Sequence, residues 1–214
     1  MVELHGGAWY LLAQFVSPRT NKREDAYGGP LKNRQKFPLQ VIAAVQAVVG
    51  DFPLGYRFLA DEWLPVGLKL PESRPFARAL AVAGVAYLSV MGGTHESFFL
   101  PDIVEKCKKP AYMVDLAAAI KEEVTVPVIT AGRIAPGEMA EHIIATDKAD
   151  LICLARVLWA DPEWPKKVKE GKDQEIVLCD PECDTCMQLV RRGHPAFCVR
   201  WPLEKQRVLK ARYA

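Results

Sequence analysis

Short apolar runs alternate along the chain with longer stretches of helical periodicity, a pattern that predicts strands connected by helices. The runs with the length of β-strands cover residues 2–5, 54–59, 85–91, 126–130 and 150–154. The stretches that predict helices cover residues 33–49, 71–83, 113–124, 137–146 and 162–170. Strands and helices that alternate in this way form βα units around a parallel sheet, so we expect an α/β fold with four or five such units.

Residues 92–110 fit neither pattern, and we expect a long loop there. Gly92 and Gly93 open it directly after an apolar strand. A loop of this length within a compact domain is usually functional. His95 lies in it, although a single loop histidine is more often simply solvated.

The composition is that of an ordinary globular protein. Half of the 214 residues are hydrophobic, a quarter are charged, and the formal net charge is +2. This charge gives no reason to expect nucleic acid or an anionic membrane as a partner. No apolar run approaches the roughly 18 residues of a membrane span, and the N-terminus lacks the pattern of a secretory signal. We therefore expect a cytoplasmic protein.

The first strand places a histidine where barrel enzymes collect their catalytic groups. Val2-Glu3-Leu4-His5 alternates apolar and polar residues, which puts Glu3 and His5 on one face. Gly6 and Gly7 end the strand, so His5 lies at its carboxyl end and Tyr10 lies in the following loop. The alternative is a hydrogen-bonded polar residue at a strand end, with Tyr10 packed into a core.

Two further features indicate a site for an anionic ligand. Arg57 interrupts an apolar strand and needs an anionic or carbonyl partner, which Asp61 or Glu62 could also supply. Gly132 and Arg156 each follow an apolar strand just before a helix, where backbone N–H groups and an arginine can bind phosphate. Turn geometry alone is the alternative for Gly132.

Four of the six cysteines crowd into one segment with the spacing C-x3-C-x2-C-x11-C. They are Cys179, Cys183, Cys186 and Cys198. In a cytosolic chain such crowding favours metal binding over disulfides. Four thiolates suit either a [4Fe–4S] cluster or Zn²⁺.

The N-terminal segment VELHGGAWYLLAQFVSPRTNKREDAYGG, with LKNRQKF after it, resembles the old yellow enzyme family of FMN-dependent oxidoreductases. The similarity is greatest to its iron–sulfur branch, which includes 2,4-dienoyl-CoA reductase and trimethylamine dehydrogenase. It extends to about residue 201. The resemblance implies part of a TIM (β/α)8 barrel, with strands 5–8 and their helices in residues 1–173 and a cysteine-rich iron–sulfur segment in residues 174–214.

The resemblance also implies what lies outside this chain. The first half of the barrel precedes the matching strand in the family, and in the iron–sulfur branch flavin- and nicotinamide-binding domains follow the barrel. NAD(P)H and FAD would then act through a part or partner that is absent here. A truncated half-barrel, or a subunit that needs a separate N-terminal half, would not be catalytic by itself.

Family positions assign cofactor contacts to this sequence. Arg57 matches the arginine that contacts the flavin ring. Gly132, Arg133, Ala155 and Arg156 match positions that hold the FMN phosphate, and Ala155 replaces a common glycine. The four cysteines match the ligands of a [4Fe–4S] cluster in position and final spacing, while their first two gaps differ slightly.

The implied reaction is reduction of the C=C bond of an α,β-unsaturated carbonyl or enoyl thioester by hydride from FMN N5. Tyr10 would donate the proton with the help of His95, and His5 would hold the carbonyl oxygen. Ala8 stands where the family usually has a second oxygen-binding Asn or His. Oxidation of an amine or another C–H bond, as in trimethylamine dehydrogenase, is the alternative.

Overall fold

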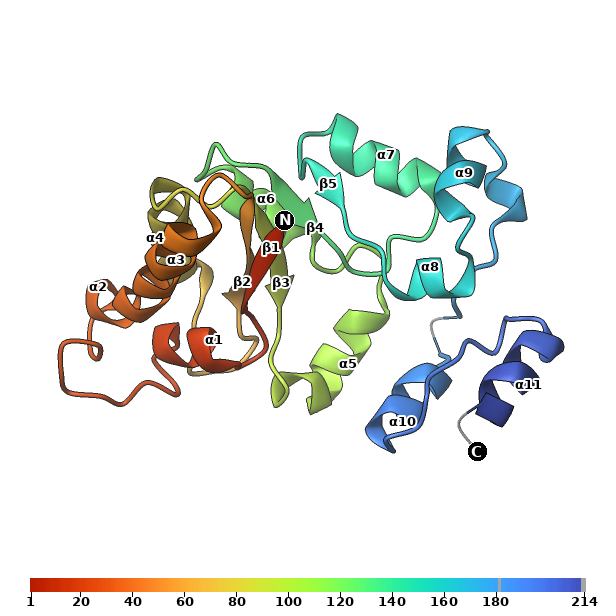
Figure 1. Ribbon diagram of the computed structural model, residues 1–214, viewed down its shortest axis with the longest axis horizontal. Helices are drawn as coiled ribbons and strands as arrows, with labels where there is room; N and C mark the ends of the chain where they lie inside the picture. Colours follow the sequence, from red (N-terminus) through yellow and green to blue (C-terminus); the bar gives the residue numbers. More distant parts are fainter. Residues whose placement is uncertain (181, 213–214) are drawn as a thin grey trace. The chain divides into compact units, whose positions relative to one another are not determined.

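The computed structural model describes residues 1–180 and 182–212, and it contains one parallel sheet (Figure 1). The strands are β1 (Val2–Gly6), β2 (Leu54–Asp61), β3 (Leu88–Gly92), β4 (Val128–Thr130) and β5 (Leu151–Ile152). They pair in chain order, β1-β2-β3-β4-β5, and every neighbouring pair is parallel. The predicted α/β fold with a parallel sheet is confirmed, and the sheet has five strands.

Helices occupy most of the connections between strands. They are α1 (Leu11–Val16), α2 (Leu31–Arg34), α3 (Lys36–Val49), α4 (Leu70–Val82), α5 (Pro101–Lys108), α6 (Val114–Lys121), α7 (Gly137–Ala145), α8 (Arg156–Ala160), α9 (Trp164–Lys169), α10 (Thr185–Arg191) and α11 (Leu203–Arg212). Two short 3₁₀ turns are η1 (Ser97–Phe99) and η2 (Asp173–Glu175). None of the helices in the described residues is long and apolar enough to cross a membrane.

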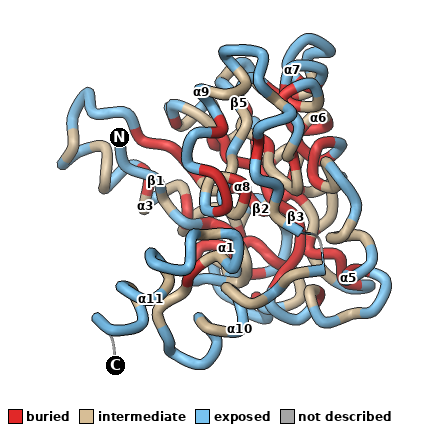
Figure 2. Tube along the Cα trace, turned by 90° about the vertical axis from the view of Figure 1, so that its right-hand side faces the viewer, coloured by how far each residue is buried: buried red, intermediate tan, exposed pale blue. Residues whose placement is uncertain are grey.

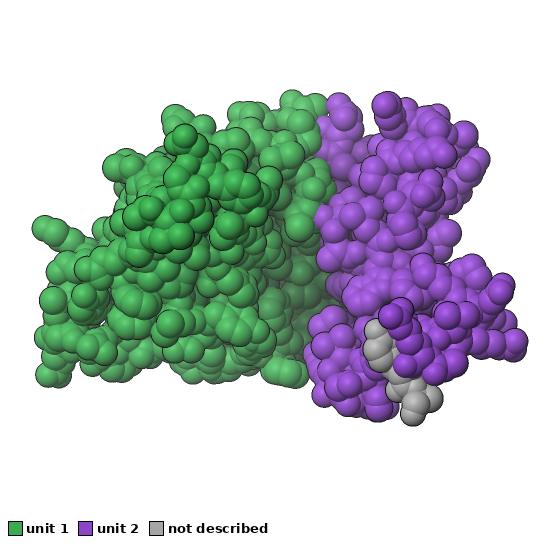
Figure 3. Space-filling model, viewed as in Figure 1, with its two compact units in different colours: residues 1–132, 142–153 green, residues 133–141, 154–214 purple. Residues whose placement is uncertain are grey.

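The chain divides into two compact units (Figure 3). Unit 1 comprises residues 1–132 and 142–153 and contains the whole sheet, and unit 2 comprises residues 133–141 and 154–214. The predicted boundary between residues 173 and 174 concerns the end of the barrel portion and stays a prediction. Residues 181, 213 and 214 of the predicted cysteine-rich segment lie outside the described residues.

One face of the sheet forms the core of unit 1. Tyr56, Phe58, Leu88 and Val90 alternate along β2 and β3 and are fully buried. Helix α4 packs on β2 and helix α6 packs on β3 and β4. Phe76 of α4 meets both aromatic residues of β2, with ring centroids 6.0 Å from Tyr56 and 5.7 Å from Phe58. Figure 2 shows these strands largely as buried chain.

The opposite face carries side chains in rows across the strands. One row contains His5, Arg57 and Ser89, which are partners in the parallel register, and it continues through Ile129 to Leu151. In a closed barrel such a row forms one layer of the interior. Here the last residue of the row is not covered by another strand, since Leu151 is 50% exposed.

The next row towards the N-terminal ends of the strands contains an aromatic ring. A Cβ atom added to Gly55 would come within 2.1 Å of the Tyr87 ring, so that ring lies directly against the glycine. Glu3 is the register partner of Gly55 and hydrogen-bonds Tyr87. Burial raises the pKa of Tyr87, and the negative charge of Glu3 raises it further.

The expectation of a long unstructured loop over residues 92–110 is wrong. The segment contains η1 and the eight-residue helix α5. Helix α5 buries only Ile103, so it lacks the repeating apolar stripe by which a helix is recognised in a sequence. It has a proline in its first turn and a Glu105–Lys108 ion pair of 3.0 Å across one turn, both of which favour a helix locally.

Candidate functional site

Three residues at the carboxyl ends of β1 and β3 come together in unit 1. The ring of Tyr10 lies 4.7 Å from that of His5 and 5.7 Å from that of His95, measured between centroids. Tyr10 is 51% exposed, and both histidines are exposed. The structure therefore brings the three predicted catalytic side chains together at a surface that a small molecule can reach.

A tight turn directs Tyr10 back towards His5. Ala8 and Trp9 have positive φ angles of 47° and 69°, which are uncommon for residues other than glycine. The backbone N–H of Tyr10 donates to the carbonyl of Gly7 at 3.0 Å and closes this turn. Gly7 itself has no room for a side chain, since a Cβ would lie 2.4 Å from Sδ of Met91.

The segment that carries His95 has a hydrogen-bonded backbone and an exposed imidazole. The backbone N–H of Thr94 donates to Oγ of Ser97 at 2.7 Å, and the backbone N–H of Ser97 donates to Oγ1 of Thr94 at 3.1 Å. Thr94 and Ser97 are fully buried. Gly93, with φ of 87°, allows the chain to turn there after β3.

Partial burial of the imidazole and a neighbouring positive charge favour the uncharged form of His5, although the residue as a whole is exposed. Burial lowers its pKa from the usual 6.5, and the positive charge of Arg57 lowers it further, while Glu3 opposes the shift. Near neutral pH the imidazole therefore carries one N–H donor and one acceptor nitrogen.

Arg57 binds a neutral group instead of the carboxylates considered from the sequence. Its Nη1 donates to Oγ of Ser89 at 2.7 Å, in the same row of the sheet. Asp61 accepts from Nζ of Lys69 at 3.0 Å and from the backbone N–H of Trp63. Glu62 is fully buried beside Trp9 and Ser17. The positive charge of Arg57 thus remains available to a ligand.

The predicted phosphate-binding residues follow β4 and β5 directly in the chain. Gly132 belongs to unit 1, and its φ of 110° satisfies the turn requirement considered from the sequence. Arg133, Ala155 and Arg156 belong to unit 2, where Arg156 begins α8. Arg133 also has a positive φ, of 54°.

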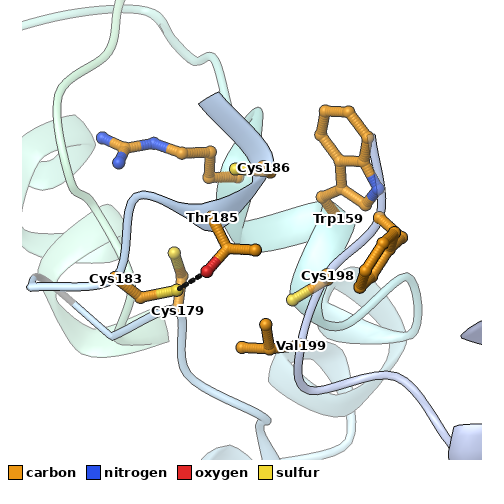
Figure 4. A pocket seen from close by; sticks show the side chains of 9 residues that line it. Trp159, Cys179, Cys183, Thr185, Cys186, Cys198 and Val199 are labelled. Carbon is orange, nitrogen blue, oxygen red and sulfur yellow. Dashed lines mark hydrogen bonds between the residues drawn. The ribbon is translucent and has the colours of Figure 1, made fainter. Parts of the chain in front are cut away.

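The four clustered cysteines line one pocket of unit 2 (Figure 4). Arg156 and Trp159 from α8 line the same pocket, with Thr185, Phe197 and Val199. All four thiols are free. Sγ of Cys183 lies 3.6 Å from Oγ1 of Thr185, the contact drawn as a dashed line in Figure 4.

The pocket holds its thiols in partly buried surroundings. Burial raises the pKa of Cys179, and the charges of Arg156 and Arg133 oppose that shift. Among the described residues no three His, Cys, Asp or Glu side chains form a group compact enough to hold a single metal ion. Cysteine thiols are nevertheless the type of ligand that binds [4Fe–4S] clusters and zinc ions.

Sequence reasoning missed two contributors to these sites. Ser89, the hydrogen-bond partner of Arg57, lies in a strand that reads as uniformly apolar apart from this one hydroxyl. The sequence indicates Arg156 only for phosphate binding, yet this residue also lines the cysteine pocket. A polar residue within a buried strand was the signal available for Ser89, but the sequence carries no comparable signal for Arg156.

Comparisons with known proteins give a consistent result. The family model described as NADH:flavin oxidoreductase / NADH oxidase family matches residues 1–175. An NADH oxidase from Thermoanaerobacter brockii is 46% identical over 180 residues, which are 83% of this chain and 27% of that protein.

Two solved structures resemble nearly the whole chain. A 2-naphthoyl-CoA reductase in complex with 2-naphthoyl-CoA has a TM-score of 0.85 at 30% identity, over 94% of this chain and 31% of that one. Histamine dehydrogenase from Rhizobium sp. 4-9 has a TM-score of 0.81 at 27% identity, over 94% and 29% of the two chains. These likenesses confirm the predicted partial TIM barrel, and the chain spans about three-tenths of the length of these relatives.

Proposed function

Because the chain belongs to the NADH:flavin oxidoreductase / NADH oxidase family, we propose that it is part of an FMN-dependent enzyme that reduces the C=C bond of an α,β-unsaturated carbonyl or enoyl thioester. The membership confirms the resemblance first seen in residues 2–37. The observation that carries the proposed reaction is the contact of Tyr10 with both His5 and His95.

Tyr10, His95 and His5 would each have a different role towards the substrate. The Tyr10 hydroxyl donates a proton to the carbon next to the carbonyl group. His95 lies edge-on to Tyr10 and supports that donor, and it relays a replacement proton from solvent, to which it is exposed. His5, uncharged near neutral pH, donates its N–H to the carbonyl oxygen. The resemblance to a reductase that binds a CoA thioester supports thioesters as the substrate class.

The residues of unit 1 suit the ring of FMN, which when bound supplies hydride transfer at N5. Arg57 is a half-buried cation whose hydrogen bond goes to the neutral hydroxyl of Ser89. Its charge can therefore stabilise an electron-rich ring next to His5, its partner in the sheet. We assign the phosphate of FMN to Gly132, Arg133, Ala155 and Arg156, the residues that follow β4 and β5.

The cysteine pocket suits a [4Fe–4S] cluster, which when bound supplies one-electron transfer. Cys179, Cys183, Cys186 and Cys198 would be its ligands. NAD(P)H and FAD would act through a part of the protein, or a partner, outside this chain. Structural zinc at the same cysteines is the alternative.

A second candidate function is oxidation of an amine or another C–H bond. The likeness to histamine dehydrogenase favours it. So does Ala8, because its methyl side chain cannot bind a carbonyl oxygen beside His5. A third candidate is a chain that is inactive until a separate N-terminal half completes the barrel. The exposure of Leu151, the last residue of the row that begins at His5, favours this candidate.

Anaerobic mixing experiments separate the candidates. The chain is combined with the remaining part of the barrel, loaded with FMN and reduced, then mixed with a 2-enoyl-CoA or a cyclic enone. The proposal expects rapid return of the oxidised flavin absorbance. Bleaching of the oxidised flavin by an amine, with no reaction of the reduced flavin with either unsaturated compound, would establish the second candidate instead.

A further inference from the structure

A single guanidinium connects the two segments that carry the proposed proton donor and its helper. Nη2 of Arg19 donates to both carboxylate oxygens of Glu96, at 2.8 and 2.9 Å. The guanidinium carbon of Arg19 lies 5.7 Å from the centroid of the Trp9 ring, within range of a cation–π interaction. Trp9 precedes Tyr10 in the chain, and Glu96 follows His95.

The two segments need such a connection because they come from different strands. Tyr10 follows β1, whereas His95 follows β3. The contact between the two rings is edge-on, with an interplanar angle of 82°. Contacts of this kind are weak, so further contacts between the two segments are needed to fix how Tyr10 and His95 meet.

Buried polar groups lie next to the backbone of Arg19. Its backbone N–H donates to Oγ of Ser17 at 3.1 Å, and Ser17 is fully buried. The carboxyl group of Glu62 interacts with the same residues: burial raises its pKa, and the neighbouring Ser17, Trp9 and Arg19 oppose that rise. The backbone of Arg19 is thus hydrogen-bonded to a buried serine, and its guanidinium contacts Trp9 and Glu96.

We propose that Arg19 is a positioning residue that sets the geometry between Tyr10 and His95 through its contacts with Trp9 and Glu96. Its catalytic consequence rests on the proposed function, in which Tyr10 donates a proton with help from His95. Arg19 would act only through its neighbours.

The ion pair of Arg19 and Glu96 is exposed enough to be removed with little effect on stability. The side chains of Arg19 and Glu96 are 35% and 43% exposed, and ion pairs at such positions contribute little to folding. Loss of the ion pair with Glu96 should therefore change the free energy of unfolding little. Proton transfer depends much more steeply on geometry, because a displacement of about 1 Å can slow a reaction markedly.

The chain offers a matched control in Arg23. Its guanidinium carbon lies 5.9 Å from the centroid of the Phe15 ring, and it forms an ion pair with Asp25. Its side chain is 50% exposed. Arg23 therefore repeats the combination of an aromatic ring and a carboxylate in the same loop, but its ring and carboxylate are Phe15 and Asp25 instead of Trp9 and Glu96.

The first measurement needs no cofactor. The chain has four histidines, so the ring C–H signals in an NMR spectrum can be assigned by substitution, and His142 and His194 serve as internal references. Arg19→Ala should move the His95 signals towards those of a free imidazole, as the ring-current effect of Tyr10 is lost. Arg19→Lys should restore part of the shift, and Arg23→Ala should leave the signals in place. Unchanged His95 signals in Arg19→Ala, or equal changes in both alanine variants, would overturn the proposal.

The second measurement uses the completed, FMN-loaded enzyme. Arg19→Ala should slow oxidation of the reduced flavin by an enoyl thioester about three- to tenfold and leave flavin reduction unchanged. In a His95→Ala background it should cause no further loss. If Tyr10→Phe itself has no effect, the proposed reaction fails, whereas the NMR result still decides whether Arg19 positions His95.

Discussion

The ring of Tyr10 stands edge-on to the ring of His95, with centroids 5.7 Å apart and an interplanar angle of 82°. The two residues are far apart in sequence and lie at the carboxyl ends of β1 and β3. The imidazole thus lies beside a tyrosine that is 51% exposed to solvent. The first prediction follows from this relationship.

Tyr10→Phe should slow oxidation of the reduced flavin by an enoyl thioester by on the order of 10²-fold or more, the usual contribution of a positioned general acid. Flavin reduction by the electron donor should stay nearly unchanged. His95→Ala should affect the same step, and the double variant should be little worse than the slower single one. Stopped-flow absorbance of the flavin measures both steps. A wild-type oxidation rate in Tyr10→Phe would favour the amine-oxidising alternative.

His5 should titrate below its usual pKa of 6.5, because burial and the charge of Arg57 disfavour the imidazolium. The fold therefore favours the neutral form, and this contribution to stability is present above pH 6.5 and lost as the pH falls through the lowered pKa. Arg57→Gln should raise the pKa of His5, whereas Glu3→Gln should lower it further. NMR titration of the His5 ring signals tests both signs. Shifts in the same direction would contradict the assigned causes.

Arg57 and Arg156 should affect FMN differently. Arg156→Ala removes a charge-assisted phosphate contact and should weaken FMN binding by roughly 1.5–3 kcal/mol. Arg57→Ala should chiefly lower the reduction potential, because it removes a positive charge beside the reduced ring. Fluorescence titration and potentiometry of the completed barrel measure these quantities. Equal and negligible effects of both substitutions would mean that the assignment of FMN contacts is wrong.

The cysteine pocket should contain iron after anaerobic preparation, at about four irons per chain. Cys186→Ser should remove most of it, because the substitution replaces one of four thiolate ligands. Cys107→Ser is the matched control, since Cys107 belongs to unit 1 and the pocket to unit 2. Metal analysis and the visible spectrum provide the test, and stoichiometric zinc without iron would instead establish a structural zinc site.

The chain purified alone should self-associate. Strand β1 pairs only with β2 among the described strands, and Val2 on it is 37% exposed. An unpaired strand edge is a template for another chain. Val2→Lys should reduce association, because a lysine on an edge strand opposes pairing. Analytical ultracentrifugation measures the effect, and a monodisperse monomer with a sharp unfolding transition would refute the half-barrel interpretation.

The sequence predicted the five strands because short, mainly apolar runs alternate with stretches of helical periodicity. It failed at α5, which buries only Ile103 and is stabilised by local effects instead of an apolar face. The contact of His5, Tyr10 and His95 was anticipated only through the family resemblance. Periodicity places His5 and His95 at strand ends, but it contains no information on how the loops that follow those strands turn.

The partners of individual side chains were the least predictable feature. Arg57 was expected to need a charged or carbonyl partner, and nearby Asp61 and Glu62 were the obvious choices in sequence. The parallel register decides otherwise, because it aligns Arg57 with Ser89 from a strand more than thirty residues later. Register depends on pairing between distant segments, so a linear pattern cannot supply it.

The ring of Tyr87 against Gly55 gives the interior of unit 1 a direction of access. On the face of the sheet that carries Arg57 and His5, this ring and Glu3 lie one row nearer the amino ends of the strands. Entry from the carboxyl ends leads first to Tyr10 and His95. We therefore expect ligands to enter at the carboxyl ends of the strands, beside Tyr10. A larger residue at position 55 would displace the Tyr87 ring and leave Tyr10 and His95 in place.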